Sequence, residues 1–204
     1  MERKIYECVI NDQVDNELEV SFVALVDRPA IEKNFLAFNE HKAVHFAIDE
    51  DRRIISGPAM IADLPIYRKD EDFGEYYVTF SKKTIMSIVQ KFFKKGFIQN
   101  FNLFHKPGSE LEGVTIFESF VVDSDRGVSP MKGFEEAPDG SWFISAKIDN
   151  DEVWDKVKSG DVKGFSVEGI FQYVKMDMAA FSKPILTPEQ ALQKIKELFE
   201  TLAI

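Results

Sequence analysis

The first 80 positions contain several short runs of apolar and β-branched residues, separated by turn-forming residues. This pattern predicts strands. The predicted strands are 5–10, 18–27, 43–48, 53–61 and 75–80. The second of these is rich in Val and Phe and ends at Arg28-Pro29, where a proline cannot continue a central strand. This part of the chain is therefore predicted to form β-sheet.

The apolar period then changes from strand to helix. The residues of the new stripe are Ile85, Ile88, Val89, Phe92 and Phe93. Their spacing of three and four puts them on one face of a helix. Ser81 precedes the stripe as a potential N-cap, and Gly96 follows it as a helix end.

Strand patterns return beyond residue 100. The predicted strands are 101–105, 114–123, 142–148 and 164–174. Residues 124–141 are rich in turn-forming Gly and Pro and predict a surface loop. A second helix is predicted at 150–159, because Asn150 can cap its start and Gly160 can end it.

The C-terminal residues predict an amphipathic helix beyond a linker at 178–186. Thr187-Pro188-Glu189-Gln190 has the form of a capping box with Pro at the first helical position. We therefore predict a main domain at 1–177 and an appendage at 178–204. About eight strands and three helices without βαβ alternation predict an α+β, mainly β fold with a mostly antiparallel, barrel-like sheet.

Charge and cysteine content narrow the function classes. The 204 residues carry a formal net charge of −10, from 35 acidic and 25 basic residues, whereas nucleic-acid binders usually have a basic surface. One cysteine, Cys8, excludes a disulfide framework and a cysteine-based zinc site. No apolar run of 18 residues and no signal peptide is present, so we expect an intracellular protein without membrane contact.

Histidine and glycine patterns give no evidence for a metal or cofactor. His41 and His45 lie four apart, but they span a loop-to-strand boundary, so two ordinary histidines are the better interpretation. No glycine-rich phosphate loop is present. We expect no cofactor.

A serine and a histidine are the candidates for catalysis. Gly164-Phe165-Ser166-Val167-Glu168-Gly169 resembles a nucleophile elbow, with the second glycine one residue late. No histidine follows Ser166, so its base must precede it, and His105 is best placed because it ends an apolar strand. From the pattern alone, a serine between glycines in a strand is usually a small residue at a crowded position, and a histidine at a strand end is usually an ordinary polar residue.

Nine short segments, in order, resemble the tailed-phage prohead proteases, specifically the XkdF-like serine protease branch. The segments are 22–32, 55–60, 66–68, 75–81, His105, 117–120, 140–142, 153–160 and 164–169. Together they span roughly residues 5 to 175, and the C-terminal helix lies outside them.

The resemblance implies a fold similar to herpesvirus assemblins, a closed β-barrel ringed by helices. It implies a serine endopeptidase with Ser166 as nucleophile and His105 as base, acting inside the assembling prohead in the host cytoplasm. Its substrates would be scaffold and major capsid protein segments, and also the chain itself. The alternatives are an inactive barrel protein with a structural or scaffolding role, and a small-ligand binder with a Phe-lined cavity.

Three carboxylates compete for the third catalytic position. Glu118 matches a recurring segment of this branch and is our first choice, to orient the His105 imidazole. Glu168 shares a strand face with Ser166, and Asp27 ends a strand that a related branch has after its nucleophile. Glu19 begins Glu19-Val20-Ser21 but lies three residues off the register set by Pro29-Ala30.

The last helix carries an apolar stripe that must be buried against something. Assemblin-like proteases commonly dimerise through helices, so the resemblance implies self-association through residues 187–204, or packing of this helix on the main domain.

Overall fold

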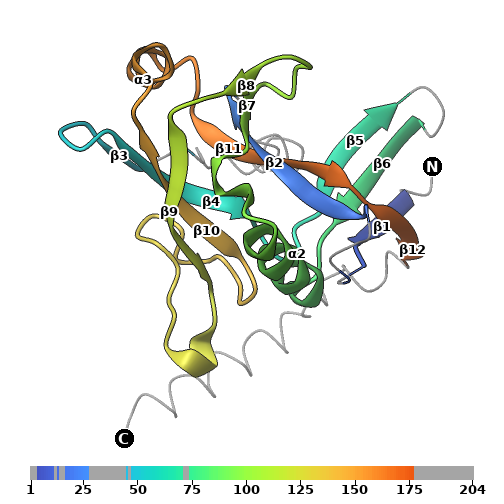
Figure 1. The fold of residues 1–204 in the computed structure, drawn as a ribbon. Helices are drawn as coiled ribbons and strands as arrows, with labels where there is room; N and C mark the ends of the chain where they lie inside the picture. The colour runs from blue at the N-terminus through green and yellow to red at the C-terminus, as the bar shows by residue number, and fades with distance from the viewer. Residues whose placement is uncertain are drawn as a thin grey trace, which may run out of the picture.

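The computed structural model describes residues 4–11, 13, 17–27, 45, 47–70 and 74–176. Within them, strands form three four-stranded sheets (Figure 1). The first sheet, in spatial order, is β12 (Gln172–Met176), β1 (Lys4–Val9), β6 (Gly74–Thr79) and β5 (Ile66–Asp70). The second is β11 (Gly164–Ile170), β2 (Glu19–Val26), β7 (Phe101–Leu103) and β8 (Glu110–Leu111). The third is β3 (Ala47–Asp49), β4 (Ile54–Met60), β10 (Trp142–Ile148) and β9 (Val114–Val121).

Most strand pairs are antiparallel, as predicted; β1–β6 and β2–β7 are the parallel pairs among the described strands. The sheets are not closed into a barrel, so the predicted closed barrel is not supported. Closure requires a hydrogen-bonded ladder between sheet edges, but each described sheet keeps two edge strands. β11 contacts β4 across two sheets without a ladder between them.

Two α-helices lie in the described residues, and their ends agree with the sequence. The first, α2 (Lys82–Lys94), begins where Ser81 Oγ accepts a hydrogen bond from Thr84 N at 3.2 Å. The second, α3 (Asp151–Ser159), begins where Asn150 Oδ1 accepts from Val153 N at 3.1 Å, and it ends at Gly160 in the left-handed conformation. Short 3₁₀ turns are η1 (Phe97–Gln99) and η2 (Ser124–Arg126).

One hydrophobic core joins the three sheets to α2. Ile85, Ile88 and Phe92 are buried, as the predicted stripe requires, whereas Phe93 is exposed. The Phe92 ring meets Trp142 of β10 with centroids 5.4 Å apart, and α2 also contacts β2. α2 therefore ties the second sheet to the third (Figure 1).

Several local predictions differ from the structure. The β5 strand was missed because three consecutive charged residues end this edge strand, Ile66-Tyr67-Arg68-Lys69-Asp70. The two-residue β8 is too short to have a pattern. The predicted strand 164–174 is divided at Phe171 into β11 and β12. Residues 178–204, with the predicted C-terminal helix and domain boundary, lie outside the described residues. No described helix has the length and apolar character needed to cross a membrane.

Candidate functional site

Ser166 lies in the middle of β11, where two neighbouring strands bring small and polar residues beside it. Its register partner on β2 is Ala24, and the partner of Ala24 on β7 is Asn102. Paired residues in a sheet project to one face, so Ser166, Ala24 and Asn102 form a row. Ser166 is 8% exposed and Ala24 is 0% exposed, so the row is buried.

His105 lies just beyond the end of β7, in the turn that leads to β8. The predicted strand 101–105 ends at Leu103, so His105 belongs to the sheet rim. The Phe104 amide donates to Leu25 O at 3.1 Å, and Ser109 Oγ donates to Leu103 O at 2.8 Å. These bonds fix the turn to β2 on one side and close it on the other.

The backbone at this turn is unusual, because Phe104 and His105 both have φ of 57°. Left-handed conformations of residues other than glycine cost about 1–3 kcal/mol each and persist where the surroundings hold them. The turn hydrogen bonds provide that support. Two strained residues in succession, one of them a histidine, are typical of a functional site.

Glu168 connects His105 to the strand row. Its Oε2 accepts a hydrogen bond from Asn102 Nδ2 at 2.7 Å and lies 3.1 Å from His105 Nδ1. A carboxylate only accepts hydrogen bonds, so this contact assigns the proton to Nδ1 and leaves Nε2 as the basic nitrogen. Glu168 is two residues from Ser166 and shares its strand face.

Asn102 is a buried polar residue at the centre of this arrangement. It is 5% exposed, and its Oδ1 has no hydrogen-bond partner among the described residues. A buried acceptor left without a partner costs about 1–3 kcal/mol. Asn102 therefore holds Glu168 at a cost in stability, which is expected where geometry serves function.

The structure contains no hydrogen bond between Ser166 and His105, although both are described; the contact it gives His105 is with Glu168. The side chains of His105 and Glu168 are 36% and 45% exposed, so a peptide can reach both. Ser166, Glu168, Asn102 and His105 thus gather on one sheet, with the basic nitrogen of His105 available for a proton.

Glu118, our first choice for the third position, lies on a different sheet. It is exposed on β9, where its register partner is Ser145 of β10. The pKa of Arg52 is raised, chiefly by its hydrogen bond with Asp49, and the negative charge of Glu118 adds to this effect. The structure gives Glu118 no contact with His105, and its catalytic role stays a prediction without geometric support.

The structure gives neither of the other acidic candidates, both described, a hydrogen bond or ion pair with His105. Asp27 follows β2, is exposed, and forms no hydrogen bond or ion pair with His105 in the described structure. Glu19 pairs with Lys95 and lies 3.6 Å from the Nζ of buried Lys91, on α2. Glu19 therefore anchors the start of β2 to the helix.

The remaining ligand-type residues give no metal site. His45 is exposed and precedes β3, and His41 lies outside the described residues. Cys8 is buried, and burial raises the pKa of its thiol to about 12. Among the described residues, no group of three or more His, Cys, Asp or Glu side chains is placed to hold a metal ion.

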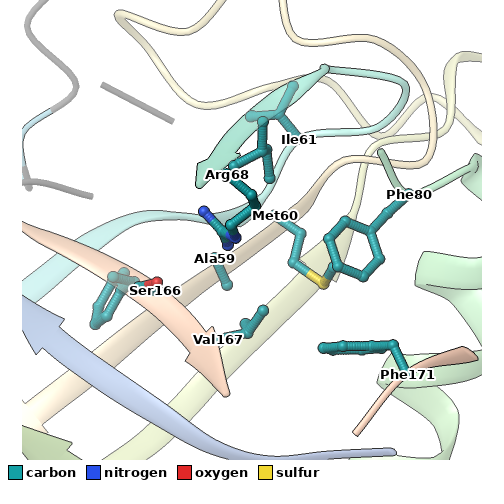
Figure 2. A pocket seen from close by; sticks show the side chains of 10 residues that line it. Ala59, Met60, Ile61, Arg68, Phe80, Ser166, Val167 and Phe171 are labelled. Atoms are coloured by element: carbon teal, nitrogen blue, oxygen red, sulfur yellow. The ribbon is translucent and has the colours of Figure 1, made fainter. Parts of the chain in front are cut away.

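A pocket adjoins Ser166 where β11 meets β4 and β5. Its walls are mainly apolar, and Figure 2 shows Met60 between the end with Ser166 and Arg68 and the end with Phe80 and Phe171. Arg68 is the one charged residue in the lining. From the sequence, Arg68 was named only within the segment 66–68 of the family resemblance. Because strand β5 was not predicted, the position of Arg68 beside Ser166 was not predicted either.

Comparison with known families places most of the chain in a phage protein family. A family model described as "Putative phage serine protease XkdF" matches residues 44–175, more than half of the 204-residue chain. The matched range includes His105 and Ser166 and excludes β1 and β2, and with them the segment 22–32 of the predicted resemblance. No curated protein and no solved structure matches the chain.

Proposed function

The chain belongs to the XkdF family of phage serine proteases, and from this premise we propose that it is an endopeptidase of prohead maturation. Ser166 is the nucleophile and His105 the base. The observation that carries this assignment is the Glu168–His105 contact on the sheet that holds Ser166. It orients a histidine whose Nε2 can act as a base, at the rim of the same sheet, and a base is what activation of a serine hydroxyl requires.

The proposed reaction begins when a peptide binds along β11. His105 Nε2 takes the hydroxyl proton of Ser166, and Oγ attacks the scissile carbonyl carbon to form a tetrahedral intermediate. His105 then gives that proton to the leaving amine, the C–N bond breaks, and an acyl ester on Ser166 remains. His105 must move to hydrogen-bond distance of Ser166 for this step, and its exposed position at the rim allows it.

Water completes the cycle. His105 removes a proton from a water molecule, whose oxygen attacks the ester carbonyl; the proton then returns to Oγ of Ser166 as the acid product leaves. Throughout both halves, Glu168 holds the Nδ1 proton and stabilises the imidazolium that forms twice. Asn102 holds Glu168 in place through its short hydrogen bond.

Substrates and location follow the family resemblance. We propose that the chain cuts scaffold and major capsid protein segments, and itself, inside the assembling prohead in the host cytoplasm. High local concentration there would favour self-association through residues 187–204. Light scattering of the full chain and of a chain ending at residue 186 tests the last point: we expect the shorter chain to be more monomeric. Unchanged mass and thermal stability would contradict it.

Ser166→Ala tests the mechanism directly. Because the change is small, we expect a folded protein whose processing of co-expressed scaffold or capsid protein falls by several orders of magnitude. Ser145→Ala is the matched control, since Ser145 is also a buried strand serine, 6% exposed, and lies on the third sheet. Undiminished processing by Ser166→Ala would refute the assignment.

An inactive structural protein is the second candidate, favoured by the missing Ser166–His105 hydrogen bond. A fluorophosphonate probe separates the two, because it labels only an activated serine. Labelling of the natural chain that is lost in Ser166→Ala and His105→Ala supports a protease. A chain that neither reacts with the probe nor processes either protein is a structural one.

A further inference from the structure

The pocket beside Ser166 combines apolar walls with one cation. It lies where the three sheets meet, lined by Met60 of β4, Ile66 and Arg68 of β5, and Phe165 to Val167 of β11. Since the nucleophile itself is part of the wall, a side chain in this pocket belongs to a residue next to the scissile bond. The pocket is therefore placed to select substrates.

Arg68 has unused capacity to bind an anion. It is half-buried on β5, yet none of the described carboxylates forms an ion pair with it, and its described hydrogen bond is a 3.3 Å contact from one guanidinium nitrogen to Tyr67 O. A guanidinium has five N–H donors in a fork that fits a carboxylate. In Figure 2 its nitrogen atoms lie at the same end of the pocket as the Ser166 hydroxyl.

The nearby thiol cannot neutralise this charge. Burial raises the pKa of Cys8 to about 12, against the opposing effect of the Arg68 charge, so the thiol is uncharged near neutral pH. Arg68 therefore keeps its positive charge next to the apolar walls, and no carboxylate in the described part of the chain pairs with it. A cation in surroundings of low polarity attracts a carboxylate more strongly than one on an open surface.

The size of the pocket favours a small end group. Its volume is about 50 Å³, whereas a cavity that takes a benzene ring has roughly 150 Å³. A carboxylate on a short aliphatic stem fits these dimensions and chemistry, with the stem against Met60 and Ile66. The net charge of −10 repels acidic peptides at long range, so any preference for them must arise locally.

We propose that this pocket binds the acidic side chain of a substrate residue next to the scissile bond, with Arg68 as the residue that determines this specificity. The proposal rests on the protease function and adds a substrate class to it: peptide segments with Glu or Asp at the cleavage site. Arg68 binds the substrate through a bidentate ion pair and takes no part in proton transfer.

The experiment uses the full chain and a peptide library derived from a bacterial proteome, with cleaved bonds identified by mass spectrometry. We expect Glu and Asp to be enriched next to the cleaved bonds. The best cleaved peptide is then compared with its Glu-to-Gln or Asp-to-Asn counterpart, for the natural chain, Arg68→Gln and Arg68→Lys. Arg52→Gln is the control, because Arg52 is an exposed arginine that pairs with Asp49 at 2.5 Å.

We expect kcat/KM of the natural chain to favour the acidic peptide by roughly 10- to 100-fold, as a charged hydrogen bond predicts. Arg68→Gln should lose this preference, because its kcat/KM should fall much more on the acidic peptide than on the amide peptide. Arg68→Lys should keep part of the preference, and Arg52→Gln should keep all of it. An active natural chain without acidic preference, or an equal loss on both peptides in Arg68→Gln, overturns the proposal and leaves the protease function standing. Cleavage of no peptide and no fluorophosphonate labelling refute both.

Discussion

Glu168 and Glu118 lie on strands of two different sheets, and of these two glutamates Glu168 is the one that contacts a histidine. Glu168 on β11 contacts His105 and is held by buried Asn102. Glu118 on β9 lies opposite Ser145 and near Arg52, with no contact to His105. Both glutamates lie on edge strands, but the strands have different neighbours: β11 adjoins β2, which adjoins β7, the strand that leads to His105, whereas β9 adjoins β10, which adjoins β4.

The difference teaches that strand order, more than strand sequence, decides which carboxylate serves a histidine. Around Glu168 the backbone is strained at two residues and a buried acceptor has no described partner. Around Glu118 the neighbouring contact is satisfied: Trp142 Nε1 donates to Ser119 Oγ at 2.9 Å. The region around Glu168 therefore contains destabilising features that the region around Glu118 lacks. This is expected if only the region around Glu168 has a catalytic role.

Exchanging each glutamate for glutamine is the sharpest test of this comparison. We expect Glu168→Gln to lower kcat/KM by roughly 10²- to 10⁴-fold, because the amide can donate to Nδ1 and stabilise the wrong imidazole tautomer. Glu118→Gln should leave kcat/KM within about twofold, since surface substitutions have small effects.

Peptide cleavage by both variants, with Glu168→Asp as a partial rescue and pH–rate profiles for each, distinguishes positioning from a folding defect. A large loss in Glu118→Gln with none in Glu168→Gln would restore Glu118 as the third residue and refute the role of Glu168.

The sequence predicted the parts of the site that depend on local pattern. The strand that carries Ser166 follows from Val and Phe content between glycines, and α2 and α3 follow from apolar period and caps that the structure confirms. His105 was placed at a strand end, and the structure has it just beyond one.

The sequence named Glu168 among the candidates for the third position but ranked Glu118 first, because the contact of Glu168 with His105 depends on long-range strand pairing. β2, about 140 residues before β11 in the chain, lies between β11 and β7 and sets the distance from Glu168 to His105. The position of Arg68 was also not predictable, because its edge strand β5 has no apolar pattern. No local pattern shows that the edges of the sheets remain open.

Removal of the Asn102 amide should have the next largest effect. Asn102→Ala deletes the 2.7 Å donor to Glu168, so the carboxylate and with it the imidazole lose their fixed position. A misplacement of about 1 Å can cost roughly 10²-fold, and we expect a fall of roughly 10- to 100-fold in kcat at nearly unchanged KM.

Stability should change little in this variant, because the unpartnered Oδ1 is removed together with the donor. Thermal unfolding of Asn102→Ala against the natural chain checks this point, and Asn100→Ala is the control at the residue two positions earlier, whose Nδ2 donates to Ser21 O at 3.0 Å. Full activity in Asn102→Ala would show that Glu168 needs no support.

The smallest expected effect concerns the second region and should change stability alone. Trp142 is fully buried, its indole N–H donates to Ser119, and its ring packs on Phe92 of α2. Trp142→Phe removes the hydrogen bond and part of the packing, for a loss of about 2 kcal/mol. This corresponds to a fall in Tm of roughly 4–8 °C for a chain of this length. Ser119→Ala should cost less, because Trp142 keeps its packing.

Peptide cleavage measured well below Tm should be unchanged in both variants, since β9 and β10 hold neither the nucleophile nor the base. A loss of activity in fully folded Trp142→Phe would show that the two regions are coupled through α2, and the separation between a chemical region and a stabilising one would then fail.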